Sequence, residues 1–323
     1  MSYKISIIGA TGLVGRKMIQ VMHERKIDIE KLYALTSSKS AGQKTDYYDE
    51  KVLELKDSNI EDCDFALFAV DSEISKKWAP KFAKKGAFVI DNSSAFRLDA
   101  NISLIVPEVN PEVIPQKPAI VANPNCSTIQ LVAALKPISG AIGIESVDIS
   151  TYQAVSGAGK AAIDALRNRK DEKTQKDIFG HIIYNNVIPK IGPFLENGFC
   201  KEEMKLIDET RKILGLPNLN IYPTVVRVPV ENCHAESIRI QLARKADIDE
   251  IRDILSNAPG IVIADGILTQ KDIDGRDEVF ISRIRQMPDD KRNVMMWIVA
   301  DNLRKGAATN AIQIMENIIS RSH

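Results

Sequence analysis

Short apolar runs alternate with helical patterns through the first 140 residues of the chain. We predict strands at 4–9, 31–36, 65–70, 87–91 and 119–122. Apolar residues at helical spacing predict helices at 13–22, 73–85 and 127–135. Alternating strands and helices are typical of a parallel sheet covered by helices, so we predict an α/β fold for this half.

The pattern changes after about residue 140 to longer segments rich in β-branched residues. Predicted strands cover 146–154, 222–230, 237–243, 279–285 and 294–299, and predicted helices cover 158–169, 201–214, 247–256 and 305–319. This mixture predicts an α+β second domain built on a mixed or antiparallel sheet. No repeat, low-complexity tract or linker marks the boundary between the two parts.

Size and charge narrow the class of protein. A chain of 323 residues favours two lobes over one. Lys and Arg together number 43, as do Asp and Glu, so no overall field attracts nucleic acid or an anionic membrane. No apolar run approaches the ~18 residues that suggest a membrane span, and the first residues show no leader pattern. We therefore expect a cytoplasmic protein without nucleic-acid or membrane partners.

A glycine-rich turn, Gly9-Ala10-Thr11-Gly12-Leu13-Val14-Gly15, joins the first predicted strand to the first predicted helix. Glycine lets backbone N–H groups approach a pyrophosphate at the start of a helix. The spacing is G-x-x-G-x-x-G, which differs from the commonest dinucleotide fingerprint. A nucleotide site is the preferred interpretation, and a tight turn without a ligand is the alternative.

The end of the second strand indicates which nucleotide is bound. NAD enzymes of this architecture place an acidic residue there, but this chain has Thr36-Ser37-Ser38-Lys39-Ser40. Hydroxyl groups and a cation suit a 2′-phosphate, so NADP is favoured over NAD. An ordinary polar surface loop is the alternative.

Cys126 is the candidate nucleophile. It follows Asn123-Pro124-Asn125 and opens a predicted helix, where the helix dipole and N–H groups stabilise a thiolate. The four cysteines show no C-x-x-C pairing, so we expect free thiols and no metal site. A single cysteine is often an inert buried residue, but the polar Asn-Cys-Ser-Thr surroundings favour reactivity.

Two further residues carry candidate chemistry. His234 lies between strand-like segments and is the best acid/base partner for Cys126 among the four histidines, although a structural role is the alternative. Arg97 follows a strand end, where open sheets bind ligands, and its guanidinium suits a phosphate or carboxylate. A solvated surface charge is the alternative for Arg97.

Taken together, these segments resemble the aspartate-semialdehyde dehydrogenase family along nearly the whole chain. The resemblance rests on the glycine turn, Ser93-Ser94-Ala95-Phe96-Arg97, Asn123-Pro124-Asn125-Cys126-Ser127-Thr128, Tyr152-Gln153-Ala154-Val155-Ser156-Gly157-Ala158-Gly159, Glu202-Glu203-Met204-Lys205, Arg227 seven residues before His234, and Asp301-Asn302-Leu303 with Lys305-Gly306-Ala307-Ala308. Chance agreement of such an ordered series is very improbable.

The resemblance implies a Rossmann-type NADP-binding domain, residues 1–127 with 304–323, and an α+β catalytic and dimerisation domain with a mixed sheet, residues 128–303. It also implies NADPH-dependent reductive dephosphorylation of 4-phospho-L-aspartate to L-aspartate 4-semialdehyde through a Cys126 thioester. This phosphorylating aldehyde dehydrogenase activity belongs to the biosynthesis of diaminopimelate, lysine, threonine, methionine and isoleucine. A homodimer or homotetramer is expected.

The family's residue roles carry over by position. Catalysis would use Cys126, His234 and Gln153, and substrate would contact Arg97, Asn125, Glu202, Lys205 and Arg227. NADP would contact Gly9, Thr11, Gly12, Leu13, Val14, Ser37, Lys39, Ser40, Ser156, Gly157 and Asn302. Many relatives have Arg in place of Lys39, and lysine keeps the charge but loses the planar fork, so the preference for NADP could be weaker.

Three alternatives stay open at this point. N-acetylglutamyl-phosphate reductase and malonyl-CoA reductase share the architecture and covalent chemistry, although Glu202 beside Arg227 favours an unmodified amino acid as substrate. A catalytically silent NADP-binding module is the third alternative. It is disfavoured because both Cys126 and His234 are present.

Overall fold

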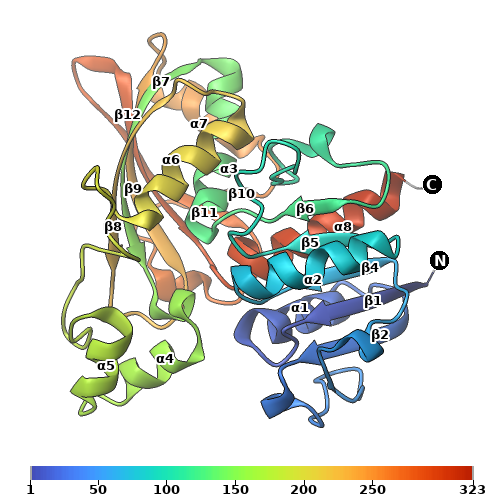
Figure 1. The fold of residues 1–323 in the computed structure, drawn as a ribbon. Coiled ribbons are helices and arrows are strands. Elements are labelled where there is room, and N and C mark those ends of the chain that lie inside the picture. The colour runs from blue at the N-terminus through green and yellow to red at the C-terminus, as the bar shows by residue number, and fades with distance from the viewer. Residues whose placement is uncertain (1, 322–323) are drawn as a thin grey trace. The chain divides into compact units, whose positions relative to one another are not determined.

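The computed structural model describes residues 2–321 of the chain. The fold consists of two compact units, residues 1–124 with 307–323 and residues 125–306 (Figure 1). Each unit contains its own six-stranded sheet. Each sheet has its own hydrophobic core, so the two units are described in turn.

The first unit is a parallel sheet in the order β3-β2-β1-β4-β5-β6. Its strands are β1 (Tyr3–Ile8), β2 (Ile29–Thr36), β3 (Leu53–Glu54), β4 (Phe65–Phe68), β5 (Phe88–Asp91) and β6 (Ile120–Ala122). The strand order reverses between β1 and β4, and ligands of open α/β sheets bind outside the carboxyl ends of strands at such a reversal. The glycine-rich turn leaves β1 at this point.

Helices cover both faces of this first sheet. Helices α1 (Leu13–Glu24) and α8 (Thr309–Arg321) pack on one face, and α2 (Ser72–Lys84) packs on the other (Figure 1). The C-terminal helix α8 belongs to this core because Ala311, Ile312 and Met315 are fully buried along one side. Segments from the two ends of the chain therefore build a single core.

Two glycines set the close approach of β1 and α1. Gly9 has φ +89°, and a Cβ there would lie 2.3 Å from the carbonyl oxygen of Ala69. A Cβ on Gly15 would lie 2.2 Å from the carbonyl oxygen of Gly9. Both contacts are with backbone, which cannot move as a flexible side chain can. The turn therefore needs glycine at both positions.

The second unit is built on a mixed sheet in the order β10-β11-β12-β9-β7-β8. Its strands are β7 (Ile144–Gln153), β8 (Asn220–Arg227), β9 (His234–Leu242), β10 (Ile261–Ile263), β11 (Val279–Met287) and β12 (Asp290–Ala300). The pairs β7–β8 and β10–β11 are parallel, and the others are antiparallel. The predicted fold class, a Rossmann-type domain followed by a domain with a mixed sheet, is confirmed.

Three helices pack together on one face of the mixed sheet. They are α3 (Cys126–Ala141), α6 (Lys201–Leu214) and α7 (Ile248–Ser256), and their apolar sides form one core with the strands (Figure 1). Helix α3 is buried almost all round over residues 127–135, which is the segment that the sequence pattern marked as helical. Two short helices, α4 (Lys160–Arg167) and α5 (Glu172–Phe179), follow β7.

Several predicted bounds were wrong, each for a local reason. The helix predicted over 158–169 is interrupted because Gly159 has φ +91°, so α4 starts only at Lys160. The helix predicted over 305–319 begins as a π-helical turn over Arg304–Ala308 before α8. Strand β9 begins at His234, three residues before its predicted start. The short strands β3 and β10 and helix α5 were missed because they are too short to show a clear period.

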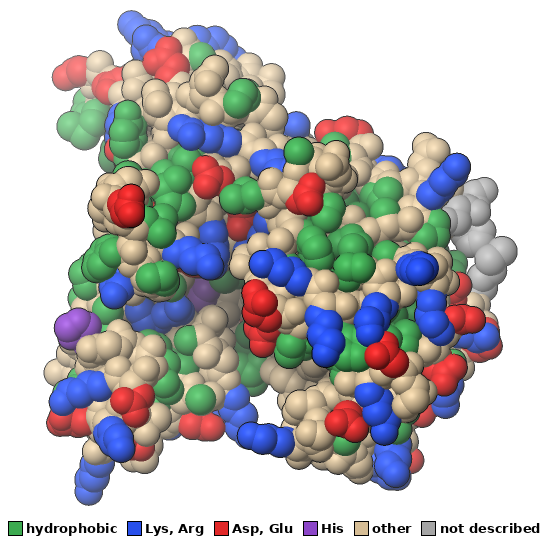
Figure 2. All heavy atoms as spheres, in the orientation of Figure 1, with side chains coloured by type: hydrophobic (Ala, Val, Ile, Leu, Met, Phe, Trp, Pro, Cys, Tyr) green, Lys and Arg blue, Asp and Glu red, His purple; other side chains and the backbone are tan. Residues whose placement is uncertain are grey.

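The distribution of charged side chains on the surface agrees with the equal numbers of basic and acidic residues in the chain. On the face in Figure 2, Lys and Arg side chains lie beside Asp and Glu side chains over most of the surface. Exposed ion pairs of the described chain include Arg244 with Glu250 and Arg252 with Asp265. In the described part of the chain, no helix is both long and apolar enough to cross a membrane.

The glycine turn gives a stability prediction. Replacing Gly15 by Ala forces a Cβ against the carbonyl oxygen of Gly9, so we expect the unfolding free energy of the first unit to fall by about 2 kcal/mol. Urea denaturation of the full chain measures this loss. Gly140→Ala in α3 is the matched control, because its Cβ would meet nothing within 4 Å, and a helical Ala gains about 0.5–1 kcal/mol. Equal urea midpoints for Gly15→Ala and the wild type would contradict the prediction.

Candidate active site

Cys126 is the first residue of α3, and the helix start is capped. The side chain of Asn125 accepts a hydrogen bond from the Ser127 N–H group at 3.0 Å. The remaining N–H groups of the first turn and the helix dipole stabilise negative charge at this end of a 16-residue helix. The predicted position of the thiol at a helix N-terminus is therefore what the structure shows.

The other three cysteines lie in different surroundings. Cys63, Cys200 and Cys233 are buried, whereas Cys126 is partly exposed. Burial raises the pKa of Cys63 to about 11 and the pKa of Cys233 still further. A thiolate is the reactive form of cysteine, so Cys126 is the best-placed nucleophile of the four.

Gln153, Arg227 and His234 meet at one edge of the mixed sheet. Gln153 ends β7, Arg227 ends the parallel neighbour β8, and His234 begins β9, which runs antiparallel to β7. Gln153 pairs directly with Arg227 in the strand register. This arrangement brings Gln153 together with two residues that lie 74 and 81 positions later in the sequence.

Gln153 connects this sheet edge to α3. Its Nε2 donates a hydrogen bond to the Ser127 hydroxyl at 2.5 Å and approaches the Glu202 carboxylate at 3.4 Å. Because Ser127 directly follows Cys126, this contact fixes the first turn of α3 against β7. Gln153 is 1% exposed, so its amide is held by the protein and not by bulk water.

A buried ion cluster lies beside the same edge. Glu202 in the first turn of α6 accepts hydrogen bonds from Lys205 Nζ and Asn125 Nδ2, both at 2.8 Å. Burial opposes its ionisation, but the charge of Lys205, the two hydrogen bonds and the charge of Arg227 outweigh burial and lower the pKa of Glu202 to about 2. Glu202 is therefore a carboxylate at neutral pH.

Arg227 supplies positive charge to this cluster. Its Nη1 donates to the carbonyl oxygen of Ala154 at 2.5 Å, and its side chain is buried. Burial lowers the pKa of the guanidinium, while the negative charges of Glu202 and Cys126 oppose that shift. The guanidinium therefore lies in reach of both the carboxylate and the nucleophilic sulfur.

His234 is completely buried, and one ring nitrogen is already bonded. The N–H group of Ala154 donates to His234 Nδ1 at 3.0 Å. Since Nδ1 acts as the acceptor, the neutral ring carries its proton on Nε2. Burial and the charge of Arg227 lower the pKa of His234 to about 3. The imidazole is thus a neutral donor whose Nε2 has no hydrogen-bond partner among the described residues.

Glycine keeps the space around these groups open. A Cβ on Gly157 would lie 3.1 Å from Arg227 Nη1 and 3.3 Å from His234 Nε2. A Cβ on Gly306 would lie 2.9 Å from the Cβ of Cys126. A cavity of about 400 Å³ is lined by Gly157 and Arg227 together with the segment 188–193. Small residues therefore leave room beside the nucleophile, the histidine and the arginine.

The second unit also contains three predicted cofactor contacts. Asn302 Oδ1 accepts the Cys233 N–H group at 2.8 Å, and Asn302 Nδ2 donates to the Ser156 hydroxyl at 2.9 Å. Gly157 directly follows Ser156 in the 3-10 turn Val155–Ala158. Ser156 and Asn302 are thus joined by a hydrogen bond, and Gly157 lies next to His234.

The first unit carries the other predicted nucleotide contacts. Helix α1 begins after Gly12, whose position provides no side-chain cap, so the first-turn N–H groups beside Leu13 and Val14 are not satisfied by a cap. The hydroxyl groups of Thr11 and Thr36 are 2.7 Å apart and join the glycine turn to the end of β2. Beyond β2, Ser37 and Lys39 are exposed and Ser40 is partly exposed.

Arg97 also lies in the first unit, in the loop after β5. Its Nε donates to the carbonyl oxygen of Asn123 at 2.9 Å, and its Nη2 donates to the carbonyl oxygen of Asn92 at 2.7 Å. Below it, the buried carboxylate of Asp91 accepts hydrogen bonds from Ser75 and Ser93, each at 2.6 Å. Arg97 is therefore held at the carboxyl ends of β5 and β6 and is not a solvated surface charge.

Sequence reasoning missed two supporting residues. Ser127 receives the hydrogen bond from Gln153, and Glu209 accepts the Asn125 N–H group at 2.6 Å. Glu209 is 1% exposed and lies seven residues after Glu202, on the same side of α6. Two acidic residues at this spacing on one helical face, opposite the N-terminus of α3, are the signal that could have identified it.

Two other features do not form part of this site. In the described residues, ligand atoms of Cys233, Asp274 and Asp301 lie within 4.8 Å of one another. Both carboxylates already accept protein hydrogen bonds, from Asn232 and from the N–H group of Gly275.

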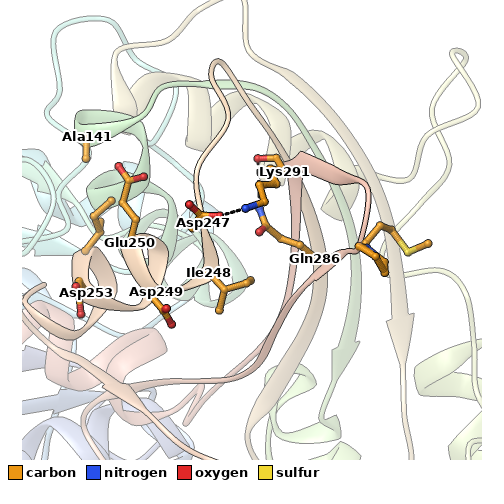
Figure 3. Close-up of a pocket in the computed structure, with 11 residues that line it drawn as sticks. Ala141, Asp247, Ile248, Asp249, Glu250, Asp253, Gln286 and Lys291 are labelled. Atoms are coloured by element: carbon orange, nitrogen blue, oxygen red, sulfur yellow. Dashed lines mark hydrogen bonds and ion pairs between the residues drawn. The ribbon is translucent and has the colours of Figure 1, made fainter.

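A separate cavity of about 890 Å³ lies beside α7 and the β11–β12 hairpin (Figure 3). Its wall includes Asp247, Asp249, Glu250 and Asp253, but Asp247 pairs with Lys291 and Glu250 pairs with Arg244. The cavity contains neither a cysteine nor a histidine. It therefore lacks the groups that the predicted chemistry requires.

The burial of neutral His234 gives a pH prediction. Its pKa is about 3 in the folded chain and about 6.5 when exposed, so below pH 6.5 the unfolded chain binds a proton that the folded chain does not. Stability is therefore lost as the pH falls from 6.5 towards 3. Between pH 7 and pH 5 we expect the wild type to lose about 2 kcal/mol more than His234→Asn, in which an amide oxygen can still accept the Ala154 N–H group. Urea denaturation at each pH measures the difference.

The control for this comparison is His181→Asn, which changes an exposed histidine and should keep the wild-type pH dependence. If His234→Asn showed the same loss on acidification as the wild type, a neutral buried imidazole at this position would be excluded.

Comparison with known proteins places this geometry in a family. The NAD-binding domain model of semialdehyde dehydrogenases matches residues 4–117, and the dimerisation domain model of the same enzymes matches residues 135–305. The aspartate-semialdehyde dehydrogenase of Aquifex aeolicus is 45% identical over 99% of this chain and 98% of its own length. That of Bacillus subtilis is 40% identical over 97% of this chain and 96% of its own.

A solved structure agrees with these relatives. Aspartate-semialdehyde dehydrogenase II of Vibrio cholerae, described as complexed with ASA, is 40% identical and superposes with a TM-score of 0.94, covering all of both chains. The resemblance inferred from the sequence motifs is thereby confirmed. The chain belongs to the aspartate-semialdehyde dehydrogenase family.

Proposed function

We propose that this chain catalyses the NADPH-dependent reductive dephosphorylation of 4-phospho-L-aspartate to L-aspartate 4-semialdehyde through a thioester on Cys126. The observation that carries the proposal is the partly exposed thiol at the start of α3, with the guanidinium of Arg227 in electrostatic reach. Relatives that share 38–45% of its residues over nearly the full chain bear the name of this activity. The product belongs to amino-acid biosynthesis.

We assign NADP binding to residues 1–127 with 304–323, and catalysis and dimerisation to residues 128–303. The glycine turn suits a dinucleotide because glycine at positions 9 and 15 allows the close packing of β1 and α1 that begins a dinucleotide-binding sheet. The N–H groups of Thr11, Leu13 and Val14 at the start of α1 would face the pyrophosphate, while that of Gly12 donates to the carbonyl oxygen of Gly9. Exposed Lys39, with the hydroxyls of Ser37 and Ser40, would bind the 2′-phosphate.

Two observations support NADP over NAD. The loop after β2 offers a cation and hydroxyl groups at the place where NAD enzymes carry a carboxylate. An aspartate-semialdehyde dehydrogenase of Candida albicans, 25% identical with a TM-score of 0.79, was solved with NADP. In the second unit, the hydrogen-bonded pair Ser156 and Asn302, with neighbouring Gly157, would complete the contacts.

The first half of the reaction transfers the acyl group to sulfur. The Cys126 thiolate attacks the acyl carbon, a C–S bond forms, and the C–O bond to phosphorus breaks. Phosphate leaves with the electron pair of that bond and takes up a proton. Arg97 and Lys205 would bind the phosphate as cations, and first-turn N–H groups of α3 would stabilise the tetrahedral oxyanion.

Other residues of the cluster would hold the amino-acid end of the substrate. Arg227 would bind the α-carboxylate, and Glu202, ionised at neutral pH, would accept a hydrogen bond from the ammonium group. Asn125 and Gln153 already orient Glu202 and the first turn of α3, so they would fix the reacting carbonyl group beside the sulfur.

The second half of the reaction releases the aldehyde. NADPH, when bound, supplies the hydride that reduces the thioester carbon. His234, with its proton on Nε2, would donate a hydrogen bond to the resulting oxyanion of the thiohemiacetal. The C=O bond then reforms, the C–S bond breaks, and the thiolate of Cys126 is restored. The Ala154 N–H group on Nδ1 therefore narrows the predicted acid/base role to that of a neutral donor.

We also propose that the chain acts in the cytoplasm as a homodimer that can pair further into a homotetramer. Family membership includes a dimerisation domain over residues 135–305. In the second unit, α3, α6 and α7 occupy one face of the mixed sheet. The other face carries half-buried Tyr152 and Trp297, whose ring centroids are 5.3 Å apart in a tilted arrangement, and exposed Tyr222, which suit a second copy of the same surface.

Removing the nucleophile tests the proposed reaction. We expect Cys126→Ala to bind NADPH with wild-type affinity and to lose more than about a thousandfold in kcat, because no thioester can form. Phosphate-dependent NADPH formation from aspartate semialdehyde measures turnover, and fluorescence titration measures NADPH binding. The control is Cys200→Ala, which removes a buried thiol elsewhere in the second unit. Near-normal turnover by Cys126→Ala would overturn the mechanism, and no turnover by the wild type would overturn the function.

Glu202 should set the choice between free and acylated amino groups. A free ammonium group can donate to a buried carboxylate, whereas an N-acetyl group leaves that carboxylate without its partner and adds bulk. We expect kcat/KM for the N-acetylated analogue to be at least about a hundredfold below that for 4-phospho-aspartate. Glu202→Gln should narrow this ratio chiefly by weakening the reaction of the unmodified substrate. Glu196→Gln, at an exposed site, should change neither value. Equal turnover of both substrates by the wild type would contradict the role of Glu202.

A further inference from the structure

A carboxyl group and an amide lie in the core of the second unit, one layer away from the catalytic groups. Glu236 follows His234 by two residues on β9, and Gln130 follows Cys126 by four residues on α3. Glu236 is 0% exposed and Gln130 is 1% exposed. Two residues along a strand, or four along a helix, return to the same side of the element. The pair therefore lies beneath the nucleophile and the histidine.

The strand register shows what surrounds the carboxyl group. Glu236 lies opposite Thr151 on β7 and Ile298 on β12, and all three side chains point to the same face of the sheet. Helix α3 packs on that face against β7, β9 and β12. The next residue on this side of β9 is Ile238, which is also buried.

The neighbouring groups leave the carboxyl group without a cation. The titratable or charged residues of the candidate site on the surrounding elements are His234 on β9, Cys126 on α3, Arg227 on β8 and Glu202 on α6. None of them contributes to the shift of the Glu236 pKa, which burial raises well above its ordinary value and the Gln130 amide opposes. Neither Gln130 nor Glu236 makes a hydrogen bond of normal geometry among the described residues. An ionised carboxylate here would be buried without compensation.

An acid and an amide can satisfy one another completely. The carboxylic O–H donates to the amide oxygen, while the amide N–H donates to the carboxyl oxygen. We propose that Glu236 stays a neutral carboxylic acid in the folded enzyme, and that its reciprocal hydrogen bonds with Gln130 position the strand of His234 against the helix of Cys126. Glu236 is thus a positioning residue, and this role rests on the function proposed for Cys126 and His234.

The proposal predicts how stability responds to pH. Because the folded state holds a proton that an exposed glutamate releases near pH 4.5, the unfolded chain binds fewer protons above that pH. The free energy of unfolding therefore falls as the pH rises from about 4.5 towards the raised pKa that Glu236 has in the folded chain. Glu236→Gln has no proton to lose, so its Tm should exceed that of the wild type by a margin that grows between pH 5 and pH 8.

Four variants test the role. Glu236→Gln keeps an amide that can pair with Gln130 and should retain kcat within about twofold. Glu236→Leu and Gln130→Leu each leave one buried polar partner unsatisfied and should lower kcat about ten- to a hundredfold through misplacement of the catalytic pair, with KM little changed. The double variant leaves no unsatisfied partner, so its Tm should lie above those of both single variants. Ile238→Ala is the control for lost packing and should lower Tm without the loss in kcat.

An infrared difference spectrum reports the protonation state of Glu236, which a loss of packing alone would not change. At pH 8 the wild type should show the carbonyl stretch of a protonated carboxylic acid that Glu236→Gln lacks. The proposal is overturned if that band is missing, if Glu236→Leu keeps the wild-type kcat, or if the effects of the two Leu substitutions on Tm simply add. Should a single variant fail to fold, the double variant and Glu236→Gln still decide between these outcomes. An inactive wild type would instead refute the proposed function, so the two failures are distinguishable.

Discussion

The buried carboxylate of Glu202 is the constraint on which the second unit's site depends. A carboxylate in the interior is costly unless cations and N–H donors compensate it, and here Lys205, Asn125 and Arg227 do so. The same partners are the groups that hold the site together, because Asn125 caps α3 and Arg227 ends β8. Because the partners of Glu202 belong to α3 and β8, they hold the N-terminus of α3 close to the end of the sheet that carries His234.

Much of this arrangement could be predicted from the sequence. The first unit was predictable because glycine at positions 9, 12 and 15, between an apolar run and a helical pattern, strongly favours the strand–turn–helix start of a nucleotide-binding sheet. The candidate site residues were predicted from the specific, ordered motif series around Cys126, Gln153, Arg227 and His234, although each residue taken singly was also compatible with a purely structural role. The structure then shows that three of these residues meet at one sheet edge.

The remainder depends on contacts that local sequence does not encode. Whether His234 Nδ1 accepts or donates is decided by the Ala154 N–H group, which lies 80 positions away. Glu209 supports Asn125 across 84 positions. The helix interruption near Gly159 and the π-helical turn before the last helix depend on the backbone conformation of single residues. The spacing of apolar residues does not reveal such local conformations. Long-range pairing and local irregularity were therefore the parts that could not be predicted.

The second unit buries two groups of polar side chains, and the carboxyl pKa is lowered in one group and raised in the other. In the layer of Glu202 and Arg227, charges are kept ionised because each has a partner within reach. Around Glu236 and Gln130, no charge of a described residue shifts the carboxyl pKa, so burial favours the neutral acid. His234 belongs to the layer of Glu202 and Arg227 and is neutral because burial and the charge of Arg227 both lower its pKa. The groups that can stabilise negative charge on Cys126 are therefore the start of α3 and Arg227, whereas the neutral imidazole of His234 offers a hydrogen-bond donor at Nε2.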